Sequence, residues 1–287
     1  MSEDNKPSLD SMIDGLDKTK ELHESIEKRP VHFDIYEKSE SSIWMFLSDL
    51  HLGARGVDYK YFKGIVTLLR KNLNIKVALV GDLYDNFLHF VSLRGANDSV
   101  APPSIQIDMI MSFLEELDAR DQLRIVGLGN HDLIREEKAV GYSVIKKIAD
   151  SSIRDKILEG KGRIALTVGK DKKHTEIYQI IMTHQAAGHS IYNPVHGAMR
   201  IARLEGHPDV VVTAHTHNPA MMIYKEAGKD IIAIKCGTFK TKDAYSEYFY
   251  SNGKIGIPCI VFCSTEHRMI PFGNPEDLLV YMKGAKK

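Results

Sequence analysis

Aspartate, asparagine and histidine residues recur in this sequence directly after short apolar runs. They are Asp49 and His51, Asp82 and Asp85, Asn130 and His131, His184, and His215 with His217. Oxygen and imidazole ligands without a thiolate suit divalent metals such as manganese, iron, zinc or cobalt. One carboxylate can bridge two such ions, and a pair of ions roughly 3.5–4 Å apart can clamp a phosphoryl group and generate hydroxide. The pattern therefore indicates a metal site that acts on phosphate.

The elements that would position these residues are strands that alternate with helices. Buried strands are predicted over 43–49, 75–82 and 123–130, and amphipathic helices over 58–73, 104–121 and 141–150. Later segments read mostly as strands, at 163–169, 175–184, 209–217, 220–226, 230–237 and 256–264. This order predicts a sheet-rich α/β protein with helices outside. Ligands of open α/β sheets bind at the carboxyl ends of strands, where the polar residues stand here.

Residues 1–30 differ from the rest of the chain in being polar and highly charged. Their apolar residues Leu9, Met12, Ile13 and Leu16 form a weak helical stripe, with Ser8 as the expected N-cap. We therefore expect a helical N-terminal arm over 1–30 and a single domain over 31–287. The connection 86–104 is long for a loop, and long loops are often functional.

Composition narrows the class of protein. The 287 residues are 43% hydrophobic and 26% charged with a formal net charge of zero, which argues against a strongly basic grip on nucleic acid over the whole surface. Cys236, Cys259 and Cys263 read as buried, reduced thiols and favour a cytoplasmic location. No apolar leader or run of ~20 apolar residues is present, so neither a signal peptide nor a membrane span is expected.

The ordered series D-x-H, GD-x-x-D, GNHD, a lone histidine and H-x-H resembles the calcineurin-like metallophosphoesterase superfamily over residues 43–240. The resemblance implies a two-sheet β-sandwich flanked by helices, a four-layer αββα fold, with a site for two divalent ions. Manganese is the first expectation for the metal, with iron, zinc, cobalt or nickel as alternatives. The implied activity is hydrolysis of a phosphoester by a metal-activated hydroxide.

The resemblance also implies a role for each motif residue. One ion would be held by Asp49, His51, Asp82 and His217, and the other by Asp82, Asn130, His184 and His215. His131 matches the catalytic histidine that binds no metal, and Asp85 matches the carboxylate that orients it. We therefore expect His131 to protonate the leaving oxygen with the support of Asp85. Gly53, Gly81 and Gly129 fit as turn residues beside the ions.

Departures from the family pattern bear on the substrate. Ala214 stands where the family usually has a glycine before H-x-H. Asn86 and Asp132 stand where the protein Ser/Thr phosphatase branch has arginine and glutamate, so an arginine that grips phosphate is missing from that motif. This favours the phosphodiesterase and DNA-repair nuclease branches, with a nucleic acid or nucleotide as substrate. A phosphomonoesterase, a nucleotide-pyrophosphate hydrolase and a non-catalytic scaffold protein remain the alternatives.

Three arginines could place positive charge beside the site. Arg94 lies in the long loop, and Arg200 and Arg203 fall at helical spacing, so that one face could meet a phosphate backbone. An ordinary solvated helix face is the alternative interpretation of Arg200 and Arg203. The sequence gives no indication of the oligomeric state.

Overall fold

The computed structural model describes residues 8–26, 32–86, 99–136, 141–171, 173–188, 190, 192–242 and 253–285. The chain divides into two compact units, Met1–Pro30 and Val31–Lys287. The smaller unit contains the predicted helix, α1 (Leu9–Ile26), and the hydroxyl of Ser8 accepts a hydrogen bond from the main-chain N–H of Ser11 at 3.2 Å. The apolar stripe of α1, which includes Leu9 and Leu16, is exposed.

The larger unit contains two sheets of six strands each. The first has the order β1 (His32–Glu37), β6 (Lys161–Asp171), β7 (His174–Thr183), β8 (Val210–Thr213), β10 (Lys229–Lys235), β9 (Ala220–Glu226). The second has the order β12 (Met269–Phe272), β11 (Cys259–Cys263), β2 (Ser41–Leu47), β3 (Ile75–Val80), β4 (Leu123–Leu128), β5 (Ile157–Glu159). Strands β2 to β5 are parallel, and so are β7, β8 and β10.

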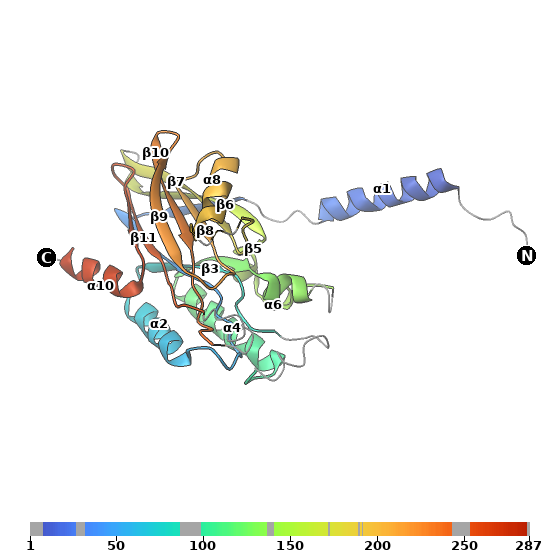
Figure 1. Cartoon of the computed structure of the whole chain (residues 1–287), viewed down its shortest axis with the longest axis horizontal. Coiled ribbons are helices and arrows are strands. Elements are labelled where there is room, and N and C mark those ends of the chain that lie inside the picture. Colours follow the sequence, from blue (N-terminus) through green and yellow to red (C-terminus); the bar gives the residue numbers. More distant parts are fainter. Residues whose placement is uncertain are drawn as a thin grey trace, which may run out of the picture. The chain divides into compact units, whose positions relative to one another are not determined.

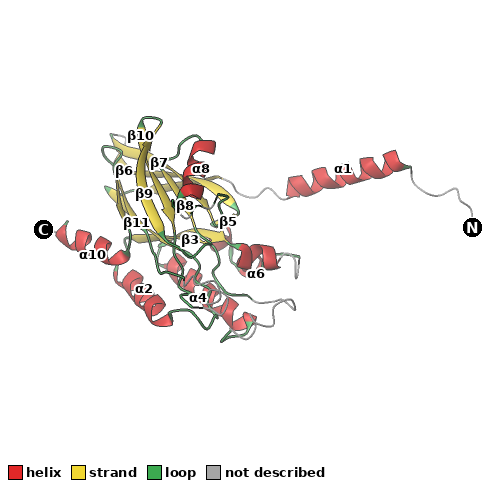
Figure 2. Ribbon diagram, viewed as in Figure 1, coloured by secondary structure: helices red, strands yellow, loops and turns green. Residues whose placement is uncertain are grey.

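Helices cover the outer faces of both sheets. They are α2 (Tyr59–Lys71), α4 (Pro103–Ala119), α6 (Val144–Ile148), α7 (Ser151–Arg154), α8 (His196–Leu204) and α10 (Pro275–Gly284), together with the short π-helix η1 (Asn130–Ile134). Figures 1 and 2 show α2 and α4 on the side of β3 and α8 beside β8 and β10. The four-layer αββα sandwich expected from the sequence is therefore confirmed.

The core consists of three apolar clusters that match these layers. Between the sheets, Trp44 and Phe46 of β2 pack among residues of β6, β7 and β8. A larger cluster joins the other face of the β2–β5 sheet to α2, α4 and α10. A small cluster joins α8 to the outer face of β8 and β10. The central strands are buried on both faces, which explains why their sequences read as continuous apolar runs.

All the strands and helices predicted after residue 40 are present, and the structure adds elements that the sequence pattern did not indicate. Strand β12 is a partly exposed edge strand of four residues that includes Pro271, so it carries a weak strand signal. Helix α10 does have a recognisable start, because Asn274 caps it and Pro275 follows. Within the described residues, no helix combines the length and hydropathy that a membrane span requires.

Candidate metal centre

The candidate ligands lie in loops that leave the carboxyl ends of parallel strands in both sheets. Asp49 and His51 follow β2, Asp82 follows β3, Asn130 follows β4, His184 follows β7, and His215 and His217 follow β8. Because parallel strands end at the same edge of a sheet, segments distant in sequence meet there. The structure thus brings together side chains from five strands of two sheets.

The side chains form three overlapping groups whose ligand atoms lie within 4.8 Å of one another: Asp49, His51 and His217; His51, Asp82 and His131; and Asp82, His184 and His215. In the first group, Nε2 of His217 is 3.1 Å from both Oδ1 of Asp49 and Nε2 of His51. In the third, Nε2 of His184 is 3.1 Å from Oδ2 of Asp82. The first and third groups each contain three of the four residues that the family resemblance assigns to one ion.

Asp82 lies between the two groups. Its Oδ2 is 4.0 Å from Nε2 of His51 and 3.1 Å from Nε2 of His184. The amide of Gln185 lies 3.1 Å from Nε2 of His215 and 3.5 Å from Oδ1 of Asn130, so Asn130 is adjacent to the second group. Gln185 follows His184 directly, but no sequence pattern indicated that it lies at the site.

Two buried ligand atoms test whether this donor set fits metal ions. Oδ1 of Asp49 and Nε2 of His184 are buried, and neither makes a hydrogen bond of suitable geometry within the described residues. Their nearest polar neighbours are other candidate ligands, at about the separation expected of atoms that share an ion. A buried polar atom without a partner is costly unless something else satisfies it. Two divalent cations would satisfy both atoms, so the residues fit the expected group.

The backbone of the ligand loops is held in an unusual conformation. Asp49, His51, Asp82, His215 and His217 all have positive φ, between 45° and 74°. Two of the three expected glycines leave space for candidate ligands, because a Cβ would lie 2.5 Å from Nδ1 of His184 on Gly81 and 2.1 Å from Oδ1 of Asp82 on Gly129, whereas a Cβ on Gly53 would meet Gln106. Ala214 keeps an ordinary φ, because the positive φ of the H-x-H turn falls on His215 instead. Clustered left-handed residues are typical of functional sites whose surroundings enforce them.

Opposite charges compensate one another inside the site. Burial raises the pKa of Asp82, but the positive charge of His184, together with the other imidazoles beside it, outweighs that effect and holds the pKa well below its ordinary value. Burial lowers the pKa of His184, but the carboxylates of Asp82 and Asp49 outweigh it and raise that pKa to about 10. In the metal-free protein, His184 therefore holds a proton on the ring that the second ion would need.

The main chain of Asp49 is tied to a distant segment. Its carbonyl oxygen accepts hydrogen bonds from Oγ1 of Thr238, at 2.8 Å, and from the N–H of Phe239, at 3.0 Å. These residues follow β10, so the end of the first sheet braces the loop that leaves the second.

The carboxylate of Asp85 does not meet His131 in the way that the sequence led us to expect. Its Oδ1 lies 3.1 Å from Nδ1 of His51 and 3.0 Å from Nζ of the buried Lys240. His131 instead directs Nδ1 to the main-chain carbonyl oxygen of Asp85, at 2.6 Å. The expected role of Asp85 is thereby corrected, because in these contacts its carboxylate faces the candidate ligand His51 and its main-chain carbonyl faces His131.

An arginine that the sequence did not reveal stands beside His131. Nη1 of Arg135 is 2.8 Å from Nδ1 of His131 and 3.3 Å from the carbonyl oxygen of Asp85. Arg135 follows His131 by four residues within one helical turn, so the spacing could have identified it. Burial lowers the pKa of His131 to about 3, and the nearby charge of Arg135 acts in the same direction.

The loops after β3 and β4 are joined by buried polar side chains. The carboxylate of Asp132 accepts hydrogen bonds from the main-chain N–H groups of Gly129 and Leu83, both at 2.9 Å. The amide of Asn86 donates to the carbonyl oxygen of His131 at 3.1 Å. Burial, together with the charge of Asp82, raises the pKa of Asp132 to about 8. Asn86 and Asp132, the departures seen in the sequence, therefore hold the loop that carries Asn130 and His131.

The three candidate substrate arginines differ in their surroundings. Arg94 lies outside the described residues. Arg203 is on α8, and its Nε lies 2.6 Å from Oε1 of Glu226, so it is engaged in an ion pair on the surface. Its expected role in substrate binding is therefore not supported. Arg200 is exposed on the same helix.

Comparison with known proteins gives a family match for most of the larger unit. The family described as calcineurin-like phosphoesterase matches residues 45–219, which is more than half of the chain. The matched segment contains all seven candidate ligands as well as Asp85 and His131. No curated protein matches the chain.

Several solved structures are similar in fold at low sequence identity. Vacuolar Protein Sorting 29 from Cryptosporidium parvum is 13% identical with a TM-score of 0.40, over 82% of this chain and 100% of that one. Vps29 from Entamoeba histolytica, complexed with zinc, is 12% identical with a TM-score of 0.39, over 80% and 97%. A protein of Streptococcus pneumoniae TIGR4, described as a predicted phosphoesterase, is 13% identical with a TM-score of 0.34, over 82% and 98%.

The position of Asp82 predicts how metal content responds to substitution. Asp82→Ala should lower the occupancy of both ions, whereas Asp49→Ala should chiefly lower that of one, because only Asp82 lies between the groups. Elemental analysis of the purified variants, with the exposed Asp108→Ala as the control, measures this. Two ions per chain in Asp82→Ala would show that the bridge is misassigned.

The raised pKa of His184 predicts that metal binding releases a proton. A raised pKa means that the ring is protonated at pH 7, and its Nε2 can bind a metal only after losing that proton. Metal affinity should therefore rise with pH between 6 and 8. Calorimetric titration of the metal-stripped protein with Mn²⁺, in buffers of different ionisation enthalpy, should detect about one proton released through this ring. Release that is unchanged in His184→Gln would contradict the assignment.

Proposed function

Because the chain belongs to the calcineurin-like phosphoesterase family, we propose that it is a metal-dependent phosphodiesterase whose substrate is a nucleic acid or a nucleotide. Hydrolysis of phosphoesters is the general activity that the family implies. The observation that carries the proposal is the convergence of buried carboxylates and imidazoles, two of whose ligand atoms have no hydrogen-bond partner within the described residues. Such a donor set is suited to metal ions rather than to internal hydrogen bonding.

In this proposal the seven side chains are shared between two ions. Asp49, His51, Asp82 and His217 would hold one, and Asp82, Asn130, His184 and His215 would hold the other. Manganese is the proposed native metal, with iron, zinc, cobalt and nickel as alternatives. Bound ions would supply Lewis-acid activation of water and would neutralise charge on the phosphate.

Two neighbouring side chains orient the candidate ligand His51 and set the position of its proton. The carboxylate of Asp85 faces Nδ1 of His51, which favours the proton on that nitrogen and leaves the Nε2 lone pair directed at the ion site. Burial raises the pKa of Asp85, but the contact with His51 and the charge of Lys240 outweigh it and lower that pKa, so the carboxylate stays ionised. We propose that Lys240 and Asp85 position His51.

His131 is the group proposed to act on the leaving oxygen. Its Nδ1 is occupied by the carbonyl oxygen of Asp85 and by Arg135, and its Nε2 lies 3.8 Å from Oδ2 of Asp82, on the side of the ligands. The lowered pKa of His131 makes the ring neutral at pH 7 in the free protein. A carbonyl oxygen only accepts hydrogen bonds, so the 2.6 Å contact with Asp85 favours a proton on Nδ1 and leaves Nε2 facing the ligands. Nε2, when it takes up a second proton, would donate it to the departing oxygen.

A diester is favoured over a monoester by the surroundings of Asn86. This residue replaces the arginine of the phosphatase branch, and its amide is committed to the carbonyl oxygen of His131 and to Oε1 of Glu136. It therefore cannot bind the additional charge of a monoester.

A cytoplasmic location stays a prediction from sequence. The three cysteines form no disulfide.

The substrate class is tested with a panel of phosphoesters. Duplex DNA, single-stranded DNA, cyclic nucleotides, nucleotide-diphosphate conjugates and p-nitrophenyl phosphate would be compared at equal Mn²⁺ concentration. We expect turnover of a diester to exceed that of the monoester p-nitrophenyl phosphate. A clear preference for the monoester would overturn the choice of diester. Metal binding without turnover of any of them, with bis-p-nitrophenyl phosphate included, would favour a non-catalytic binding protein.

The position of His131 predicts a dependence on the leaving group. His131→Ala should keep its metal content but lose about 10²–10⁴-fold in rate on esters with alkoxide leaving groups. Nitrophenyl esters should lose much less, because their leaving group hardly needs a proton. Rates on the two substrate types are compared within one preparation.

Asp85→Asn provides the contrast to His131→Ala. Because the Asp85 carboxylate faces His51, this substitution should weaken metal retention and lower the rates on both substrate types together. An equal rate loss on both substrate types in His131→Ala would instead assign that ring to stabilisation of the bound phosphate. Unchanged rates would remove His131 from the mechanism.

A further inference from the structure

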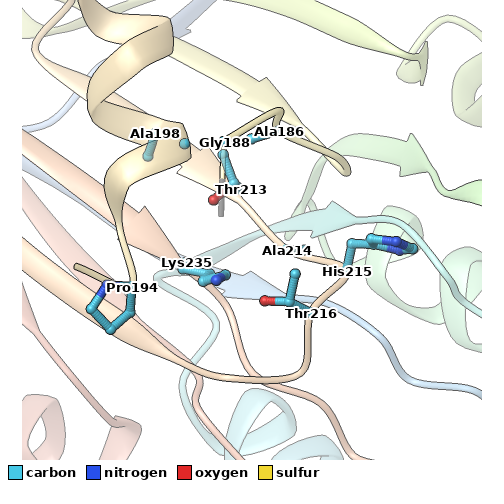
Figure 3. Close-up of a pocket in the computed structure, with 10 residues that line it drawn as sticks. Ala186, Gly188, Pro194, Ala198, Thr213, Ala214, His215, Thr216 and Lys235 are labelled. Carbon is cyan, nitrogen blue, oxygen red and sulfur yellow. The ribbon is translucent and has the colours of Figure 1, made fainter. Parts of the chain in front are cut away.

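A pocket lies beside the candidate metal centre and shares His215 with it. Its walls come from the segment after β7, the start of α8 and the ends of β8 and β10 (Figure 3). Most of the lining is main chain and small side chains. A Cβ on Gly197 would lie 2.9 Å from Cβ of Ala186, so this wall has no room for a larger residue. The polar side chains of the lining besides His215 are those of Thr213, Thr216 and Lys235.

Lys235 brings a positive charge without a counter-ion to this pocket. It is the last residue of β10 and is partly buried, and among the described residues no carboxylate forms an ion pair with it. Burial lowers the pKa of Lys235, which is the direction expected when an ammonium loses water without gaining an anion. Figure 3 shows its side chain between Pro194 and Thr216.

Further features of the pocket also favour a negatively charged group. Oγ1 of Thr216 is buried and has no hydrogen-bond partner within the described residues. Helix α8 begins at His196 against this wall, and the first turn of a helix carries partial positive charge. Arg200 lies close by, because its Cδ is 3.8 Å from the position of a Cβ on Gly188, which lines the pocket. Among the residues that the structure describes, no acidic side chain lines the pocket.

We propose that this pocket binds a second phosphate group of the substrate, adjacent to the phosphoester that is cleaved. The inference rests on the proposed function, because the pocket is a substrate subsite only if His215 helps to hold the reacting phosphate. It narrows the substrate to phosphoesters that carry another phosphate. That group could stand across a sugar, as in a polynucleotide, or be joined through an anhydride, as in a nucleoside polyphosphate.

The test uses chromogenic esters that differ only in the second phosphate. They are thymidine 5′-(p-nitrophenyl phosphate), the same compound with a 3′-phosphate, and the p-nitrophenyl ester of thymidine 5′-diphosphate. Lys235→Met removes the charge and keeps much of the side chain's length. In Lys235→Met, kcat/KM should fall about tenfold or more for a compound that carries the second phosphate. For the compound without the second phosphate, kcat/KM should change by no more than about twofold, which is about the uncertainty of comparing variants in this way.

Matched variants distinguish loss of second-phosphate binding from a loss of activity on every compound. Lys225→Met removes an exposed lysine from β9, in the same sheet, and should leave all three rates unchanged. Thr216→Val should reproduce the selectivity of Lys235→Met with a smaller loss. The compound that loses rate identifies the source, with the 3′-phosphate ester standing for polynucleotides and the diphosphate ester for nucleoside polyphosphates. An equal loss on all compounds, or no loss on any, would overturn the proposal.

Failure of the proposed function is distinguishable from failure of the subsite. If the wild-type protein hydrolyses none of the compounds, the proposed phosphodiesterase activity fails. Dissociation constants of the same three compounds, measured by calorimetry with wild type and Lys235→Met, then decide the inference. Tighter binding of a compound with the second phosphate, lost in Lys235→Met, would uphold the pocket, and equal affinities would overturn it.

Discussion

The buried carboxylate of Asp82 is the group on which the arrangement of this site depends. Its Oδ1 accepts a hydrogen bond from the N–H of His131 at 2.9 Å, and its Oδ2 faces His184 and His51. A single anion therefore links the loops that follow β2, β3, β4 and β7. A carboxylate buried this deeply is stable only where cations or donors surround it. The imidazoles gathered around it meet that need in the metal-free protein, and divalent ions would meet it in their place.

The stability of the two-sheet core compensates for the unfavourable free energy of this site. Left-handed backbone at five candidate ligand positions is unfavourable in conformational free energy at each position, and only rigid surroundings maintain it. The strands that carry Asp49 and Asp82 are buried on both faces, with Trp44 and Phe46 packed between the sheets. Hydrogen bonds that two main-chain N–H groups donate to the carboxylate of Asp132 then fix the loops themselves. The candidate ligands are consequently held in place by the surrounding protein itself.

Much of this could be predicted from the sequence, because strands buried on both faces and the residues at their ends have strong patterns. The layered fold, and the convergence of the candidate ligands at strand ends, followed from those patterns and from the family resemblance. The partner of a side chain could not be predicted in the same way. Asp85 turns its carboxylate to His51 and only its carbonyl to His131, and Arg203 pairs with Glu226 from another strand. Such contacts depend on three-dimensional proximity, which residue spacing within one segment does not encode.

The hydrogen bonds that Thr238 and Phe239 donate to the carbonyl of Asp49 bear on the folding of the protein during its synthesis. The Thr238 contact spans 189 residues of sequence, so the loop carrying Asp49 and His51 lacks this brace until most of the chain exists. Contacts of such separation form late in folding, and domains emerge from the ribosome from the N-terminus onward. A nascent chain that already carries the first strands would not yet hold its metal ligands in place. Competence to bind metal would thus arise only near the completion of synthesis, which would keep unfinished chains inactive.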